Sequence, residues 1–127
     1  MLDHRSVYKQ DVLIFLPLAL PWINVQLLTF LLSIGAEQSF VFSTLESGLL
    51  GLFGTLGLAF SWLRLSVDDS RSMVAISLTV KVAAAIWLAW MAVALQVPAL
   101  YLLAGLDALA AVVCFASLIL PQFSSLK

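Results

Sequence analysis

The amino-acid sequence predicts an all-α integral membrane protein, folded as an antiparallel four-helix bundle with up-down topology. Three observations support this prediction: an apolar composition, four apolar stretches of membrane-spanning length, and an uneven distribution of Lys and Arg. Of the 127 residues, 63% are hydrophobic and only 10% are charged. Soluble domains are typically about 45–50% apolar and about 25% charged. Lipid rather than water is therefore expected to cover most of this chain.

Four apolar stretches are each long enough to cross a bilayer, since a helix needs roughly 20 apolar residues for this. We expect helices over residues 12–34, 45–67, 73–95 and 97–120, within a single transmembrane domain that covers residues 1–127. The first stretch is longer than the core of a secretory signal peptide, which has about 7–15 residues. It is therefore interpreted as a membrane span rather than as a cleaved leader.

Helix-capping residues support these boundaries. Ser43 and Glu46 have the spacing of a capping box, in which each side chain satisfies a free backbone amide at a helix start. Asp68, Asp69 and Ser70 all suit the beginning of the third helix. Pro98 suits the first turn of the fourth, where its missing N–H costs nothing. Pro121 follows the fourth stretch, where that helix should end.

Five of the six basic residues fall on one side of the predicted membrane. Arg5 and Lys9 precede the first span, Arg64 and Arg71 flank the loop between the second and third, and Lys127 follows the fourth. The other two loops contain neither Lys nor Arg. Because cytoplasmic loops carry an excess of these residues, we expect cytoplasmic N- and C-termini and a location in the cell membrane (inner or plasma membrane).

Two charged residues lie inside the apolar spans, Lys81 in the third and Asp107 in the fourth. Each is unfavourable by about 2.5–3.5 kcal/mol near a helix centre. Both share a helix face with small residues, which is typical of faces that pack against other helices. With Asn24 at a similar depth in the first span, we expect a polar cluster near the midplane. It would be either a structural pair that fixes helix register or a proton or substrate site.

Prolines and glycines predict where the helices bend and pack. Pro17 and Pro21 each remove a backbone donor and free the carbonyl four residues earlier. We expect a kink there, either static or able to move as a hinge. Small residues allow helices to approach closely, so the second helix is expected to lie centrally or to meet another subunit. Its four packing positions are Gly48, Gly51, Gly54 and Gly57.

Several function classes lack the residues that they require. The one histidine, His4, precedes the spans, so no bis-histidine haem site is expected. The sequence contains no Walker or dinucleotide-binding motif, no zinc-ligand spacing and no nucleophile–base combination. Cys114 has no partner for a disulfide, and no basic cluster suggests nucleic-acid binding. We therefore expect a protein that is not an enzyme and has no metal, cofactor or nucleic-acid partner.

The leading hypothesis is a small multi-pass membrane protein that serves as an accessory, scaffold or assembly subunit of a membrane complex. Its expected partners are the lipid bilayer and either another membrane protein or further copies of itself. The alternative is a small oligomeric transporter or channel that uses a midplane site of Lys81 and Asp107. A third hypothesis is a lipid- or quinone-binding protein with its ligand near the proline kink.

Overall fold

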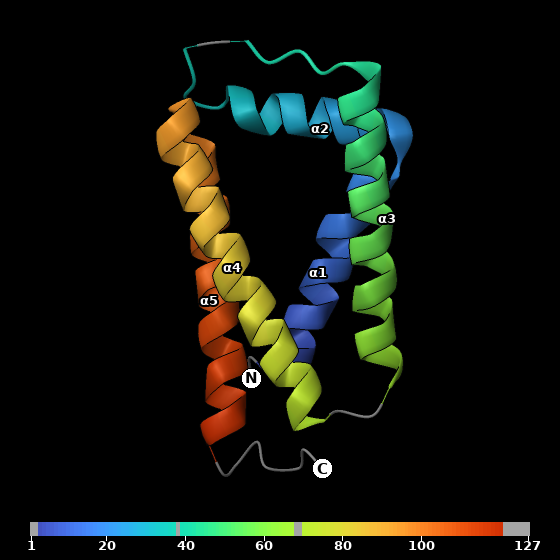
Figure 1. Ribbon diagram of the computed structural model, residues 1–127, viewed down its shortest axis with the longest axis vertical. Helices are drawn as coiled ribbons and strands as arrows, with labels where there is room; N and C mark the ends of the chain where they lie inside the picture. Colours follow the sequence, from blue (N-terminus) through green and yellow to red (C-terminus); the bar gives the residue numbers. More distant parts are fainter. Residues whose placement is uncertain (1–2, 38, 68–69, 121–127) are drawn as a thin grey trace.

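The computed structural model describes residues 3–37, 39–67 and 70–120, which contain five α-helices and no strand (Figure 1). The predicted all-α class is confirmed. Asp68, Asp69, Pro121 and Lys127 lie outside the described residues. The helices are α1 (His4–Ala19), α2 (Pro21–Ser33), α3 (Thr44–Ser66), α4 (Arg71–Leu95) and α5 (Pro98–Ile119).

Three of these helices, α3, α4 and α5, are long and apolar enough to cross a membrane. The helices α1 and α2 pass the same test only as a pair, and that pair is bent by 108°. The chain therefore has three helices suited to a membrane, or four spans if the bent pair counts as one. Apolar helices of membrane-spanning length were predicted, and this part of the prediction is confirmed.

The prediction of one continuous helix over residues 12–34 is wrong. α1 already begins at His4 and ends before Leu20, whose backbone is extended (φ −91°, ψ 120°), and Pro21 then begins α2. A proline has no N–H with which to continue the hydrogen-bond ladder of the preceding helix. The Leu20 amide instead donates to the Pro17 carbonyl at 3.3 Å. The expected kink is therefore a complete break between two helices.

The early start of α1 depends on Asp3. Its carboxylate accepts hydrogen bonds from both the amide and the hydroxyl of Ser6, each at 2.9 Å. A carboxylate at this position satisfies a free amide of the first helical turn. The polar beginning of the chain is consequently helical, and Asp11 lies inside α1 rather than ahead of it.

The later helices begin at the expected caps. The Ser43 amide donates to Glu46 Oε2 at 2.7 Å and the Glu46 amide donates to Ser43 Oγ at 3.3 Å, which completes the capping box. Ser70 Oγ accepts from the Met73 amide at 3.2 Å, and Pro98 lies in the first turn of α5. α3, α4 and α5 therefore correspond closely to the predicted stretches.

The helices form two pairs, α1 with α3 and α4 with α5 (Figure 1). Gln96 adopts a left-handed conformation (φ 54°) after α4, and α5 then runs back along α4. α2 lies across the end of the molecule at which α3 begins and α4 ends. The start of α1, the end of α3, the start of α4 and the end of α5 all lie toward the opposite end (Figure 1).

Two apolar clusters pack the first two helices against the α4–α5 pair. The first brings side chains of α1 against α4 and α5, and its buried members are Val7, Tyr8, Val74, Ala110 and Cys114. The second packs α2 against the connection between α4 and α5, and its buried members are Leu32, Ala92, Val97, Ala99 and Leu100. One cluster therefore lies toward each end of the molecule.

Close packing between α1 and α3 depends on two glycines. A Cβ atom added at Gly54 would lie 2.4 Å from the carbonyl carbon of Leu18, and one added at Gly57 would lie 2.5 Å from the ring of Phe15. Both distances are far below van der Waals contact. A Cβ atom at Gly48, in the same helix, would meet nothing within 4 Å. The glycines of α3 thus have different roles, which the sequence spacing alone does not separate.

We expect Gly54→Ala to lower the free energy of unfolding in detergent by about 1–3 kcal/mol, because the added methyl group must displace the backbone of α1. Gly48→Ala is the matched control. It should be neutral or stabilising by up to about 1 kcal/mol, since alanine favours the helix and has room. Thermal unfolding followed by circular dichroism measures both, and equal effects of the two substitutions would contradict this packing.

Candidate functional site

Four charged side chains from four different helices meet inside the protein. Asp11 of α1 accepts from Arg64 of α3 at 2.7 Å (Nη2 to Oδ2) and from Lys81 of α4 at 2.5 Å (Nζ to Oδ1). Lys81 Nζ also donates to Oδ1 of Asp107 in α5 at 2.7 Å. We call these four residues the ion network. It contains two positive and two negative charges, so it is neutral as a whole.

The members of the ion network are enclosed to different extents. The exposed fraction of the side chain is 2% for Asp11, 3% for Arg64 and 9% for Lys81, but 19% for Asp107. Removing a charge from water costs several kcal/mol, which only close pairing and additional hydrogen bonds offset. The neutral two-plus-two composition therefore explains how four charges are tolerated in so apolar a protein.

Arg64 is held by hydrogen bonds as well as by its ion pair. Its Nη1 donates to Ser77 Oγ and its Nη2 donates to Ser61 Oγ, both at 3.0 Å. Each serine hydroxyl donates in turn to a carbonyl one helical turn earlier, at 2.9 Å for Ser77 and 2.8 Å for Ser61. The serines are thereby oriented as acceptors, and Arg64 is fixed at the junction of α3 and α4.

Aromatic rings cover the guanidinium group of Arg64. Its Cζ atom lies 4.6 Å from the centre of the Tyr8 ring and 4.7 Å from that of the Phe60 ring. A cation over an aromatic face is attracted by the quadrupole of the ring, and more strongly where water is excluded. Tyr8 is fully buried. These contacts make Arg64 a fixed structural element rather than a mobile surface charge.

The two carboxylates of the ion network differ in their partners. Asp11 is bound by two cations, one on each of its oxygens. For Asp107, Lys81 is the one ion-pair partner among the residues that the structure describes. Asp107 is therefore both the less enclosed and the less strongly held of the two carboxylates.

The structure brings two of the three predicted cluster residues together. Lys81 and Asp107 are in direct contact, whereas Asn24 is not bonded to either of them. Asn24 is fully buried and its Nδ2 donates to the Ser47 carbonyl of α3 at 3.2 Å. The break at Leu20 explains this difference, because it turns α2 away from the direction of α1 and moves Asn24 with it.

Sequence reasoning missed Asp11 and Arg64. Both stand at the polar ends of apolar stretches, where charged residues ordinarily mark the membrane boundary, and Arg64 was used in that way to orient the chain. A helical stripe was nevertheless present in the sequence. His4, Tyr8 and Asp11 are spaced by four and three residues and are all buried in α1. If the first helix is taken to begin at His4 rather than at residue 12, Asp11 lies on the same helix face as Tyr8 and is expected to point inward.

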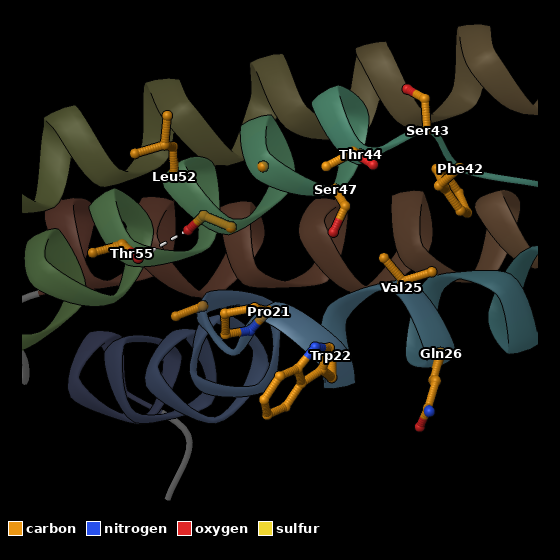
Figure 2. A pocket seen from close by; sticks show the side chains of 13 residues that line it. Pro21, Trp22, Val25, Gln26, Phe42, Ser43, Thr44, Ser47, Leu52 and Thr55 are labelled. Carbon is orange, nitrogen blue, oxygen red and sulfur yellow. Dashed lines mark hydrogen bonds between the residues drawn. The ribbon is translucent and has the colours of Figure 1, made fainter.

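An open groove lies between α2 and the first half of α3, next to the break that follows α1 (Figure 2). Trp22 and Gln26 come from α2, and Ser47 and Leu52 come from α3 on the other side. Trp22 is 85% exposed, so it is not packed against protein. This groove is the region where the third sequence hypothesis expects a lipid or quinone.

The described residues contain no group of three or more His, Cys, Asp or Glu side chains that could hold a metal ion. The chain matches no protein family model, no curated protein and no solved structure. The ion network, the groove and the exposed helix faces are therefore the features of this chain that bear on its function.

The connections within the ion network predict which double substitutions restore stability. Lys81→Met leaves Asp107 without a cation, and we expect it to lower the free energy of unfolding by about 3–5 kcal/mol. Adding Asp107→Asn removes the unpaired charge while Asp11 and Arg64 remain paired. This second substitution should recover about 0.5–3 kcal/mol, measured by thermal unfolding in detergent.

The matched control combines Lys81→Met with Asp11→Asn. That pair of substitutions leaves Arg64 and Asp107 as opposite charges that do not contact each other, so no comparable recovery is expected. If both double variants regained the same stability, the pairwise contacts described above would not be the source of the effect.

Proposed function

We propose that this protein is a non-catalytic accessory or scaffold subunit of a membrane complex. The observation that carries the proposal is the closed pairing of the ion network. Each of its charged groups has an opposite charge in contact, so the expensive buried charges have a structural explanation in the joining of four helices. A chain organised in this way presents a defined set of helix faces to its surroundings.

One face of α3 supports the partner-binding part of this proposal. Gly48, Thr55 and Ala59 are exposed and lie on one side of the helix at spacings of seven and four residues. Small residues on a membrane-facing helix allow a second helix to approach closely. Gly48 and Thr55 also line the groove beside α2. The open space at Gly48 suits the docking of a helix from another membrane protein or from a second copy of this chain.

Gly48→Leu tests this face. We expect wild-type protein, extracted from its native membrane in mild detergent, to migrate on a native gel in an assembly larger than the single chain. Leucine at residue 48 would hold the partner helix away and shift at least half of the protein to the free form. Gly105→Leu in α5 is the control, because it also has open space and should leave the assembly intact. Migration of the wild type as a single chain would contradict the proposal.

The cell membrane, with both termini in the cytoplasm, is the proposed location. The distribution of Lys and Arg supports it, although Arg64 is now seen to be a member of the ion network. The described chain supports it as well, because the start of α1 and the end of α5 lie toward the same end of the molecule (Figure 1).

Reporter fusions test this orientation. A reporter inserted at Glu37, between α2 and α3, should be active only on the outer side of the membrane. A reporter at Asp69, between α3 and α4, or after Lys127 should be active only in the cytoplasm. Activity of the Glu37 and Asp69 fusions on the same side would rule out a membrane-spanning α3 and overturn the proposed topology.

Transport is the second candidate function, and one specific observation favours it. Asp107 is the only member of the ion network with a side chain exposed by more than a tenth, at 19%. Ionisable residues inside a membrane frequently mark ion or proton pathways. A small transporter built on this site would load at Asp107 and would require two or more copies of the chain to enclose a pathway.

A further inference from the structure

We propose that Asp107 is an exchangeable member of the ion network. When it takes up one proton, a small monovalent anion occupies its place beside Lys81 Nζ. The ligand class is a singly charged anion such as chloride or a short carboxylate, bound together with one proton. Movement of the anion across the membrane would rest on the transport alternative. Binding of the anion does not, because it involves this chain alone.

The pairing pattern separates a fixed part of the ion network from an exchangeable one. Asp11 is clamped between Arg64 and Lys81, and Arg64 is further held by two serines and two rings. If Asp107 leaves, Lys81 still keeps Asp11 as a partner. Departure of Asp107 therefore does not dismantle the contacts among the other three residues.

Charge balance explains why an anion must replace the lost carboxylate. The fixed part consists of Arg64, Lys81 and Asp11 and carries a net charge of +1. An uncompensated charge in an apolar protein interior is strongly unfavourable. Protonation converts the Asp107 carboxylate to a neutral acid with one O–H bond, and the incoming anion restores neutrality. One proton and one anion therefore bind together without a change in net charge.

Small apolar side chains flank Asp107 on α5. Ala104 and Ala111 lie one turn before and one turn after it, and both are buried. Their methyl groups neither donate nor accept hydrogen bonds, so Lys81 Nζ and the protonated Asp107 would be the donors for the anion. Asp107 is also more exposed than Asp11, at 19% against 2%, so its position is the more accessible of the two.

Few other ionisable groups face this site. Asp11 comes from α1, Arg64 from α3 and Lys81 from α4. On α5 itself, the buried thiol of Cys114 lies two turns beyond Asp107. The coupling of the anion to a proton is accordingly assigned to Asp107, since Asp11 is enclosed and each of its carboxylate oxygens already contacts a cation.

Chemical rescue in the purified full chain tests the proposal, with formate as the probe. Asp107→Ala removes the exchangeable carboxylate and leaves the fixed charge of +1. We expect formate to raise its thermal unfolding midpoint until the site saturates, whereas sulfate at equal ionic strength should not. Asp11→Ala is the matched control, because its site is enclosed and formate should not restore it.

The wild type provides a second, quantitative readout. Because one proton accompanies each anion, the apparent affinity of the wild type for chloride should fall as the pH rises, by up to about tenfold per pH unit. Asp107→Asn keeps the shape of the side chain without the titration, so its chloride affinity should not depend on pH. If Asp107→Ala does not fold, the comparison of Asp107→Asn with the wild type still tests the proposal.

Absence of rescue, equal rescue of both alanine variants, or pH-independent chloride binding by the wild type would overturn the inference. Formate-driven acidification of liposomes containing the protein tests transport separately. Binding without acidification would eliminate the transport alternative and leave the binding site standing. Loss of anion binding would overturn this inference but not the scaffold proposal, which the native-gel assay of the Gly48 variant tests separately.

Discussion

The carboxylate of Asp11, held between two cations, is the contact on which the arrangement of the helices depends. α1 packs mainly along α3 and α4 packs mainly along α5. Asp11 ties the first pair to the second through Lys81, and Arg64 closes the junction by binding both Asp11 and Ser77. In an apolar interior such contacts are electrostatically strong, and an unpaired charge is correspondingly unfavourable. The helices are therefore held in one mutual position.

The sequence revealed half of this site for a clear physical reason. Lys81 and Asp107 stand out because apolar residues surround them on both sides, so no boundary of a membrane span can explain them. Asp11 and Arg64 stand where apolar stretches end, and a charge there has an ordinary explanation at the membrane surface. Composition along the chain distinguishes an interior charge from a boundary charge only when the length of the helix is already known.

The fold was predictable in three of its helices and not at the beginning of the chain. Capping residues and hydropathy located α3, α4 and α5, because both signals are local. The two prolines indicated a bend after α1, but hydropathy carries no information about direction. The angle of 108° depends on distant packing, with Leu32 of α2 against Val97 and its neighbours. Because of the same turn, Asn24 does not lie beside Lys81 and Asp107, where a straight first helix was expected to place it.

The long separation of Asp11 from its partners has a consequence for how the protein is made. Arg64 follows it by 53 residues and Lys81 by 70. During synthesis, Asp11 is therefore made before either of its cations, and its carboxylate lacks both countercharges until α3 and α4 have followed. With 16 residues, α1 spans only about 24 Å, less than the roughly 30 Å hydrocarbon core. The complete ion network can therefore form only after α3, α4 and α5 have been made, so the contacts that join the first helix to the later ones depend on the end of the chain.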